Sequence, residues 1–296
     1  MLPAGSACAC RHRAAWPQRA SGPDRRPQKL EHRAAEMLEP VVAELDAAVA
    51  EAPSAHIDET SWTEATEKTW LWVSLTDEVT VFMIADNRGA DMARSILGTD
   101  REKIVSSDRY ASYDWIAERQ FCWSHLRRDF QAMIDRQDEG SVIGERNCLG
   151  PRIGCSTGGT RLRWDHRLEY VPGLVRPLQW ALGRGTSCVR SKTAGTCREL
   201  LAGEAHLWTF VRVRGIEPTN NSAERAWRRA VLGRKSSGAT ASEWGNRFVE
   251  RVRSVAATCR QQGRNVLEYL TVCFQARLAG DPLPSLLTQH AVIIQI

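Results

Sequence analysis

Three runs of residues in the first third of the chain have the composition of β-strands. Residues 55–60 (AHIDET), 69–76 (TWLWVSLT) and 79–85 (VTVFMIA) are rich in β-branched and aromatic side chains. Asp77 and Glu78, between the last two runs, suit a turn. Because strands joined by short turns pair with each other, the three runs predict an antiparallel meander.

Helical and extended patterns then alternate up to about residue 130. The resulting order, β-β-β-α-β-α-β-α, predicts an α/β fold in which helices pack on the faces of a mixed sheet. The elements after the meander are a helix at 89–97, a strand at 103–107 (KIVSS), a helical stretch opened by Asp108, a strand at 119–122, and a basic helix through 126–130.

The start of the chain divides into two parts. Residues 1–28 are rich in Ala, Arg and Pro without any period, so we expect this segment to be disordered. From residue 29 to residue 52 apolar side chains recur at helical spacing and predict a helix that leads into the domain. Pro40 should interrupt this helix, because proline lacks the amide hydrogen that the helix interior uses.

The most informative stretch is 216–235, which reads IEPTNNSAERAWRRAVLGRK. Asn220 and Asn221 follow a proline and a threonine and are typical of turns and of helix N-termini, so a helix should begin near Ser222. Glu224 is then a single carboxylate among five cationic side chains of this helix.

Two interpretations of Glu224 remain open. It belongs to a solvated helix and pairs with Arg228 one turn on, or it is a metal ligand beside cations that bind phosphates. The second interpretation needs partner carboxylates. Asp58 lies within a predicted strand, where Asp is disfavoured, and Asp108 ends another, where α/β sheets bind ligands. For each Asp alone, a turn or strand-end cap is the simpler explanation.

Length and charge limit the possible classes of protein. The 296 residues suffice for one large domain or two small ones. The 40 Lys and Arg residues outnumber the 35 Asp and Glu residues, and the net charge of +5 permits a polyanionic partner. The sequence has no run of 18 apolar residues, so it predicts no membrane span. The Arg-rich start lacks the apolar core of a signal peptide. We therefore expect a cytoplasmic protein.

The cysteines and two tryptophans have ordinary explanations. Nine cysteines without a repeated C-x-x-C argue against a disulfide scaffold and against a zinc ribbon. Cys122 and His125, in CWSH, have the spacing of metal ligands but no second pair, so a buried thiol and a packed histidine are preferred to zinc. Trp70 and Trp72 share one strand face and are interpreted as core side chains rather than as a base-stacking platform.

Several stretches of this sequence resemble a single family. They are HIDETSW with WLWVSL, SSDRYASYD, CWSHLRRDF, and PTNNSAERAWRRAVLGRK followed by RFVERVRSVAATCRQQGRNVLEYL. These stretches resemble the transposases of the insertion sequence 66 family, a bacterial DDE group, over about residues 29–146 and 186–287. The resemblance implies a ribonuclease H-like α/β fold, interrupted by a helical insertion between the second Asp and the Glu.

The same resemblance implies the chemistry and its residues. Asp58, Asp108 and Glu224 match the catalytic acids and metal ligands of the family. Their carboxylates suit two Mg²⁺ ions, for which Mn²⁺ substitutes, in DNA cleavage at the element's ends and strand transfer to target DNA. The implied partners are double-stranded DNA and further copies of the chain in a homo-oligomer, with no membrane. A metal-dependent nuclease of the same fold and a non-catalytic DNA-binding protein are the alternatives.

Secondary roles are assigned to basic and amide side chains of the matching stretches. Asn220 and Asn221 cap the helix, and orienting Glu224 is the alternative role. The arginines would contact phosphates and so position DNA without reading its sequence, and a surface or ion-pair role stays open for each. The arginines in question are Arg127, Arg128, Arg225, Arg228 and Arg229.

The chain departs from the family pattern in two places. We expect no amino-terminal module ahead of the catalytic region, and we interpret the chain as a truncated copy. Between residues 147 and 185 Gly, Arg and Pro replace the expected helical pattern, which we interpret as a reading-frame slip, an ordinary divergent loop being the alternative. The activity of this copy stays open.

The expected divisions are 1–28, a disordered start; 29–52, a leading helix; 53–146, the first part of the core; 147–198, a disrupted insertion; 199–287, the completion of the core; and 288–296, a tail.

Overall fold

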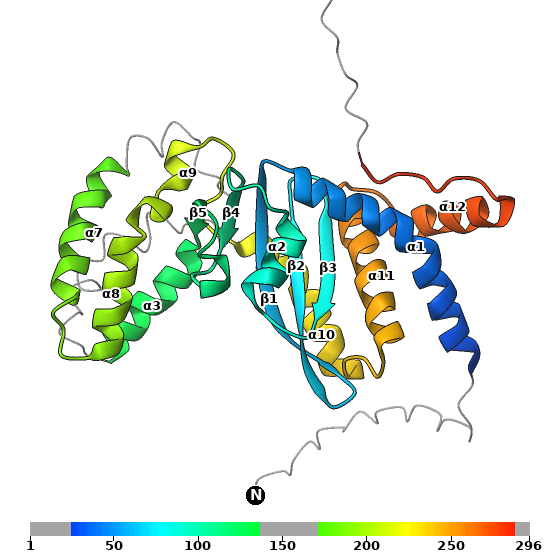
Figure 1. The fold of residues 1–296 in the computed structure, drawn as a ribbon, viewed down its shortest axis with the longest axis horizontal. Helices are drawn as coiled ribbons and strands as arrows, with labels where there is room; N and C mark the ends of the chain where they lie inside the picture. Colours follow the sequence, from blue (N-terminus) through cyan, green and yellow to red (C-terminus); the bar gives the residue numbers. More distant parts are fainter. Residues whose placement is uncertain (1–24, 137–170, 288–296) are drawn as a thin grey trace, which may run out of the picture.

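The computed structural model describes residues 25–136 and 171–287. A five-stranded mixed sheet lies at its centre, with helices on both faces and a further group of helices beyond one edge (Figure 1). The strands are β1 (Ser54–Glu64), β2 (Glu67–Leu75), β3 (Thr80–Ala85), β4 (Ile104–Ser107) and β5 (Glu118–Phe121), in the order β3-β2-β1-β4-β5 across the sheet.

Strand β1 is central and pairs with both halves of the sheet. It forms an antiparallel meander with β2 and β3, and β4 and β5 run parallel to it. The five strands expected from the sequence are confirmed, as is the mixed α/β class with flanking helices. Because β4 pairs in parallel with the first residues of β1, the carboxyl end of β4 lies beside the middle of β1.

The hairpin of β1 and β2 is longer than its apolar residues indicate, and pairing continues to Glu64 and Glu67. Trp62 is buried, and its Nε1 donates to the Thr240 hydroxyl at 3.1 Å. The amide of Ala65, in the turn, donates to the Thr240 carbonyl at 2.7 Å. These contacts join residues far apart in sequence, which explains why the strand-like patterns of the sequence covered only 55–60 and 69–76 and not the polar end of the hairpin.

The two faces of β1 carry different side chains and different helices. Ile57 and its neighbours on one face pack against α2 (Ala90–Leu97) and the short helix η1 (Ala111–Tyr113). The opposite face, which includes Trp62, packs against α10 (Asn221–Ser237). A helical stretch was expected after the fourth strand, and the structure has only the single 3-10 turn η1 there.

Helix α1 (Arg25–Glu51) is continuous through Pro40, so the expected interruption is wrong. Its apolar stripe packs with α11 (Glu243–Gln261), α12 (Val266–Ala279) and the β3 edge of the sheet. The exposed position of the proline explains the difference, because the buried stripe on both sides of Pro40 stabilises the helix across the missing amide bond.

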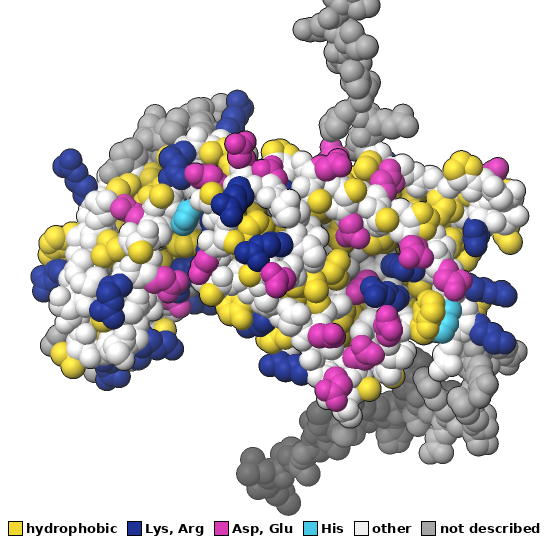
Figure 2. Space-filling view, in the orientation of Figure 1, with side chains coloured by type: hydrophobic (Ala, Val, Ile, Leu, Met, Phe, Trp, Pro, Cys, Tyr) yellow, Lys and Arg dark blue, Asp and Glu magenta, His cyan; other side chains and the backbone are white. Residues whose placement is uncertain are grey.

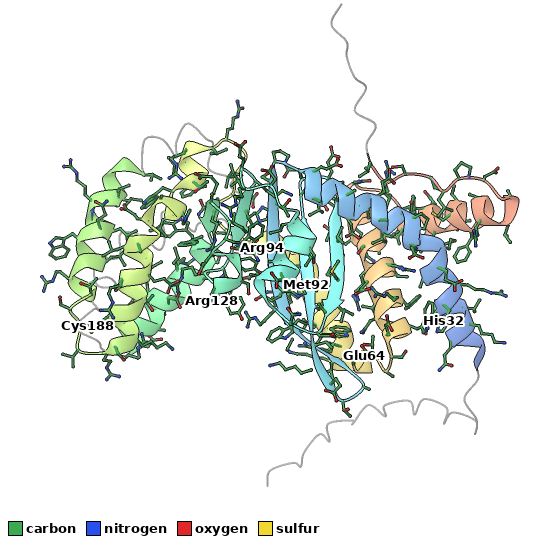
Figure 3. The ribbon with its side chains drawn as sticks, viewed as in Figure 1. His32, Glu64, Met92, Arg94, Arg128 and Cys188 are labelled. Atoms are coloured by element: carbon green, nitrogen blue, oxygen red, sulfur yellow. The ribbon has the colours of Figure 1, made fainter. Side chains whose placement is uncertain are left out.

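Both ends of α1 are anchored by contacts from distant parts of the chain. Near the start, the His32 ring stacks on Trp244 with centroids 4.6 Å apart (Figure 3). Near the end, the buried Lys103 ammonium donates to the carbonyl oxygens of Val49 and Leu97 at 2.6 Å each. A cation at two helix carboxyl ends is stabilised by both helix dipoles.

A group of helices lies beyond β5 and shares one apolar cluster (Figure 1). Helix α3 follows β5 directly, and the next described segment returns to the sheet through short helical turns. The group comprises α3 (Trp123–Asp135), α7 (Pro172–Gly185), α8 (Ser191–Ala202), η3 (Glu204–Leu207) and α9 (Thr209–Arg212).

Helix α7 was not expected from the sequence. Leu174, Leu178 and Leu182 recur every four residues and are buried, but Gly, Arg and Pro between them obscured the pattern. The sequence was expected to lack a sustained helical pattern between residues 147 and 185. For residues 172–185 this expectation is wrong. The expectations for residues 1–24, for 147–170 and for the tail at 288–296 lie outside the described residues.

Candidate functional site

Asp58 lies in the middle of β1 and points toward α10. Its Oδ2 accepts a hydrogen bond from Trp227 Nε1 at 2.9 Å, and its Oδ1 accepts one from the Glu59 amide at 2.9 Å. The residue is 9% exposed. Burial is the largest of the causes that together raise the pKa of Asp58 to about 7; the Trp227 hydrogen bond opposes the rise, and the charges of Glu59 and Asp108 add to it. Among the described residues Asp58 has no ion-pair partner.

Asp108 follows β4 directly and lies beside Asp58. The parallel register pairs His56 with Ser106, and two further residues along each strand bring Asp58 level with Asp108. Asp108 Oδ1 accepts the amide hydrogen of Tyr110 at 2.9 Å. Its negative charge also contributes to the raised pKa of Asp58. An acid in the middle of β1 thus interacts with an acid at the end of its parallel neighbour β4.

Glu224 lies in the first turns of α10 and contacts α3. Its Oε1 accepts from Arg128 Nη2 at 2.9 Å and lies 3.7 Å from His125 Nδ1. Arg128 is found where the helical group meets the sheet (Figure 3). The cation paired with Glu224 therefore comes from another helix, and the simple pair with Arg228 on the same helix is wrong.

Helix α10 connects the position of Glu224 to the position of Asp58. Trp227, one turn after Glu224, donates the hydrogen bond to Asp58. Within the described residues, however, the three side chains whose ligand atoms all lie within 4.8 Å of one another are Cys122, His125 and Glu224. The three predicted acids do not form so close a group there, and their joint catalytic role stays a prediction.

Asn220 and Asn221 fasten α10 to its neighbours. The Asn220 side chain makes no capping bond to α10, so capping by this side chain is wrong. Instead Asn220 Nδ2 donates to the Ile57 carbonyl at 2.7 Å and Oδ1 bonds His56 Nδ1 at 2.9 Å. Asn221 Oδ1 accepts from the Ser124 hydroxyl at 2.8 Å. The pair thus ties the start of the helix to β1 and α3.

Cys122 and His125 lie where β5 passes into α3. The Cys122 thiol is buried, as expected, and its Sγ accepts the amide hydrogen of Asn220 at 3.1 Å. His125 Nδ1 is buried and has no hydrogen-bond partner among residues 25–136 and 171–287. The spacing of the two residues was visible in the sequence, but their contact with Glu224 was not, because α10 begins about a hundred residues later.

The family is decided by a comparison with known families. The model described as "Transposase IS66 family" matches residues 27–247, which is more than half of the chain. This chain belongs to the IS66 transposase family.

One curated protein is similar to this chain over most of the chain's length. The IS66-family chain is 27% identical over 245 residues to "Uncharacterized protein y4qI" of Sinorhizobium fredii (strain NBRC 101917 / NGR234). The match covers 73% of this chain and 45% of the relative, so the chain spans about half the length of that protein. No helix among residues 25–136 and 171–287 is long and apolar enough to cross a membrane.

The candidate DNA-contacting arginines of the IS66-family chain lie in two places. Arg128 pairs with Glu224, whereas Arg225 and Arg229 line a groove of about 640 Å³ between α10 and α11. Sequence reasoning missed Arg253 and Arg260, which line the same groove from α11. The positions of these two could have been found from their helical spacing. Arg127 and Arg228 are exposed.

Charge on the opposite side of the sheet is less uniform. Figure 2 shows the face that carries α2, where acidic and basic side chains are interspersed. Acidic side chains gather there toward the tip of the hairpin formed by β1 and β2. The groove between α10 and α11 lies on the other face of the sheet, as the contacts of α10 with Trp62 and Phe82 require. The basic side chains of the groove are therefore separate from this mixed surface.

Proposed function

We propose that this IS66-family chain contains the catalytic domain of a transposase, which cleaves DNA and transfers strands with a ribonuclease H-like fold. Asp58, Asp108 and Glu224 would hold the catalytic metal ions. The observation that carries the proposal is the pair of acids on neighbouring parallel strands, of which the buried Asp58 has no cationic partner among the described residues. The central antiparallel meander followed by two parallel strands supports the proposed fold.

The donor set fits magnesium. Carboxylate oxygens are the ligands that Mg²⁺ prefers, and a buried carboxylate with a raised pKa has an unbalanced charge that a cation would offset. When bound, Mg²⁺ supplies activation of a water or 3′-hydroxyl and stabilisation of the leaving oxygen. The Trp227 and Tyr110 N–H groups hold the carboxylates of Asp58 and Asp108 in fixed orientations. Glu224 would exchange its contact with Arg128 for a role beside them.

The groove between α10 and α11 supports double-stranded DNA as the partner. Arg225, Arg229, Arg253 and Arg260 converge on it. Burial and the charge of Arg260 lower the pKa of Arg253, and a bound phosphate would relieve this crowding of like charges. Phosphate contacts release counterions, so affinity for DNA should fall steeply with salt. We also propose that the protein acts in the cytoplasm and assembles as a homo-oligomer.

Strand transfer with pre-cleaved element ends tests the function. Glu224→Gln and Asp58→Asn should each reduce joining by on the order of 1000-fold, the effect of losing about 4 kcal/mol of transition-state stabilisation. DNA affinity should change little. Asp91→Asn, which removes an exposed acid on α2, is the matched control and should retain joining.

The alternatives give different outcomes in the same assay. A nuclease would nick the DNA in the presence of Mg²⁺ and never join strands. A DNA-binding protein without catalysis would bind DNA in a salt-dependent way and show no metal-dependent chemistry in the unaltered chain. Either result, or full joining by Glu224→Gln, would refute the proposal.

A further inference from the structure

A second group of potential metal ligands lies between α3 and α10, and it differs in chemistry from the acids of the sheet. Cys122 Sγ, a ring nitrogen of His125 and a carboxylate oxygen of Glu224 all lie within 4.8 Å of one another. We propose that Cys122, His125 and Glu224 form a binding site for one borderline divalent cation of the zinc type. The proposal does not rest on the proposed function.

The ligand types and their separations suit zinc. Thiolate, imidazole and carboxylate are the three kinds of ligand that Zn²⁺ takes in proteins. Around a tetrahedral zinc ion, nitrogen and oxygen ligands with bonds of about 2.0–2.1 Å lie about 3.4 Å apart. His125 Nδ1 and Glu224 Oε1 are 3.7 Å apart, so this pair needs a shift of only a few tenths of an ångström, and the Cys122 sulfur lies within 4.8 Å of both ligands.

The histidine nitrogen at this site lacks the partner that buried polar atoms normally have. His125 Nδ1 is buried and makes no hydrogen bond within the described part of the chain, although most buried polar atoms in proteins are paired. A cation between Nδ1, Cys122 and Glu224 would satisfy it. The Arg128 guanidinium on Glu224 is the competing cation, but it is largely exposed and its pairing is correspondingly weak.

The sulfur of Cys122 has a backbone hydrogen-bond donor and lies at the start of a helix. Sγ accepts the Asn220 amide hydrogen at 3.1 Å, and Cys122 is the N-cap residue of α3. Such N–H donors and a helix N-terminus stabilise negative charge on sulfur. The Asn220 side chain is itself held by β1, so the sulfur is positioned from two sides.

The site has an entry route and an open position. His125 and Glu224 are partly exposed, which would let an ion reach the buried sulfur. Three protein ligands leave the fourth tetrahedral position for water, as in zinc sites that bind a further group. Because Glu224 also belongs to the proposed magnesium set, zinc here would withdraw it from Asp58 and Asp108.

Co²⁺ spectroscopy on the full chain tests the inference. Co²⁺ replaces zinc and gives a thiolate-to-metal absorption band when it binds sulfur. Cys8, Cys10 and His12 form another potential metal-binding group, so every variant should carry Cys8→Ser and Cys10→Ser. In this background we expect one thiolate-bound Co²⁺ per chain, which one equivalent of Zn²⁺ displaces.

Three variants separate the proposed ligands from other side chains. Cys122→Ser should abolish the thiolate band, and Glu224→Gln should keep the band while weakening Co²⁺ affinity at least about tenfold. Cys259→Ser, which alters a buried thiol in α11, is the matched control and should change neither. If Cys122→Ser fails to fold by circular dichroism, His125→Gln serves instead and should weaken affinity to the same extent.

Two results would overturn the inference. One is the lack of a thiolate band in the unaltered site at a tenfold excess of Co²⁺, and the other is a band whose strength and affinity are unaffected by the ligand variants. Neither result involves DNA. A chain that fails to join strands could still pass this test, and an active transposase could fail it, so the two proposals are tested separately.

Discussion

Asp58 and Glu59 are neighbours on β1, but they point to opposite faces of the sheet and have different surroundings. The Glu59 side chain is 1% exposed, pairs with Arg88 and accepts a hydrogen bond from the Tyr113 hydroxyl. Asp58 is also buried, but among the described residues its hydrogen-bond donors are the Trp227 indole and the backbone alone. One acid has a cation and a phenol, and the other has neither.

The difference distinguishes a structural acid from a candidate functional one. Burial raises the pKa of both carboxyl groups, but Tyr113 and Arg88 oppose the shift at Glu59. At Asp58 only hydrogen bonds oppose it, and the pKa reaches about 7. A buried carboxylate without a cation destabilises the folded protein unless a ligand supplies the missing charge. This contrast supports the proposed ion site on the α10 face of β1.

The largest effect should come from removing the structural acid. Glu59→Ala leaves Arg88 without its partner and opens a space beside Tyr113, so the free energy of unfolding should fall by about 3–5 kcal/mol. Urea unfolding at pH 7 would measure this change. A loss below about 1 kcal/mol would show that the pairing on the α2 face contributes little, and the contrast between the two acids would then be mistaken.

Asp58→Asn should have the opposite sign. The pKa of Asp58 rises from 3.8 in the unfolded chain to about 7 in the folded protein, so the folded state holds its proton more tightly. Below pH 4 this residue imposes no penalty, and between about pH 4 and pH 7 stability falls as the unfolded state ionises first. At pH 8 Asp58→Asn should therefore raise the free energy of unfolding by about 2–3 kcal/mol.

The pH dependence and the effect of metal provide the controls for Asp58→Asn. The gain in stability should shrink as the pH is lowered to 4, and saturating Mg²⁺ should stabilise the unaltered chain more than the variant. Denaturant unfolding at pH 4, 6 and 8 would measure both. A gain independent of pH would contradict the titration of Asp58 as its cause.

The smallest effect should come from the indole that holds Asp58. Trp227→Phe removes the N–H donor, so the pKa of Asp58 should rise further and the free energy of unfolding at pH 8 should fall by about 1 kcal/mol. Thermal unfolding of the single and double variants would measure the coupling. In the Asp58→Asn background the loss should be smaller, and an equal loss in both backgrounds would argue that Trp227 acts through packing alone.

Local patterns predicted the sheet, and through it one part of the site. Asp58 and Asp108 were identified from their places in strands, and the parallel pairing of β1 with β4 places the end of β4 beside the middle of β1. Contacts between distant elements left no such signal. Arg128 and Glu224 are 96 residues apart, and Glu59 and Tyr113 are 54 residues apart, so neither pair follows from periodicity. Helix α7 was hidden because Gly, Arg and Pro separate its buried leucines.

The two faces of helix α10 carry side chains with different surroundings. Glu224 and Trp227 contact α3 and β1, whereas Arg225 and Arg229 line the groove shared with α11. Any displacement of this helix moves both sets together, since neighbouring residues of a helix cannot shift independently. Occupation of the groove and the position of Glu224 are thus linked through the helix. A molecule bound in the groove would change the spacing between Glu224 and the sheet without contacting Glu224.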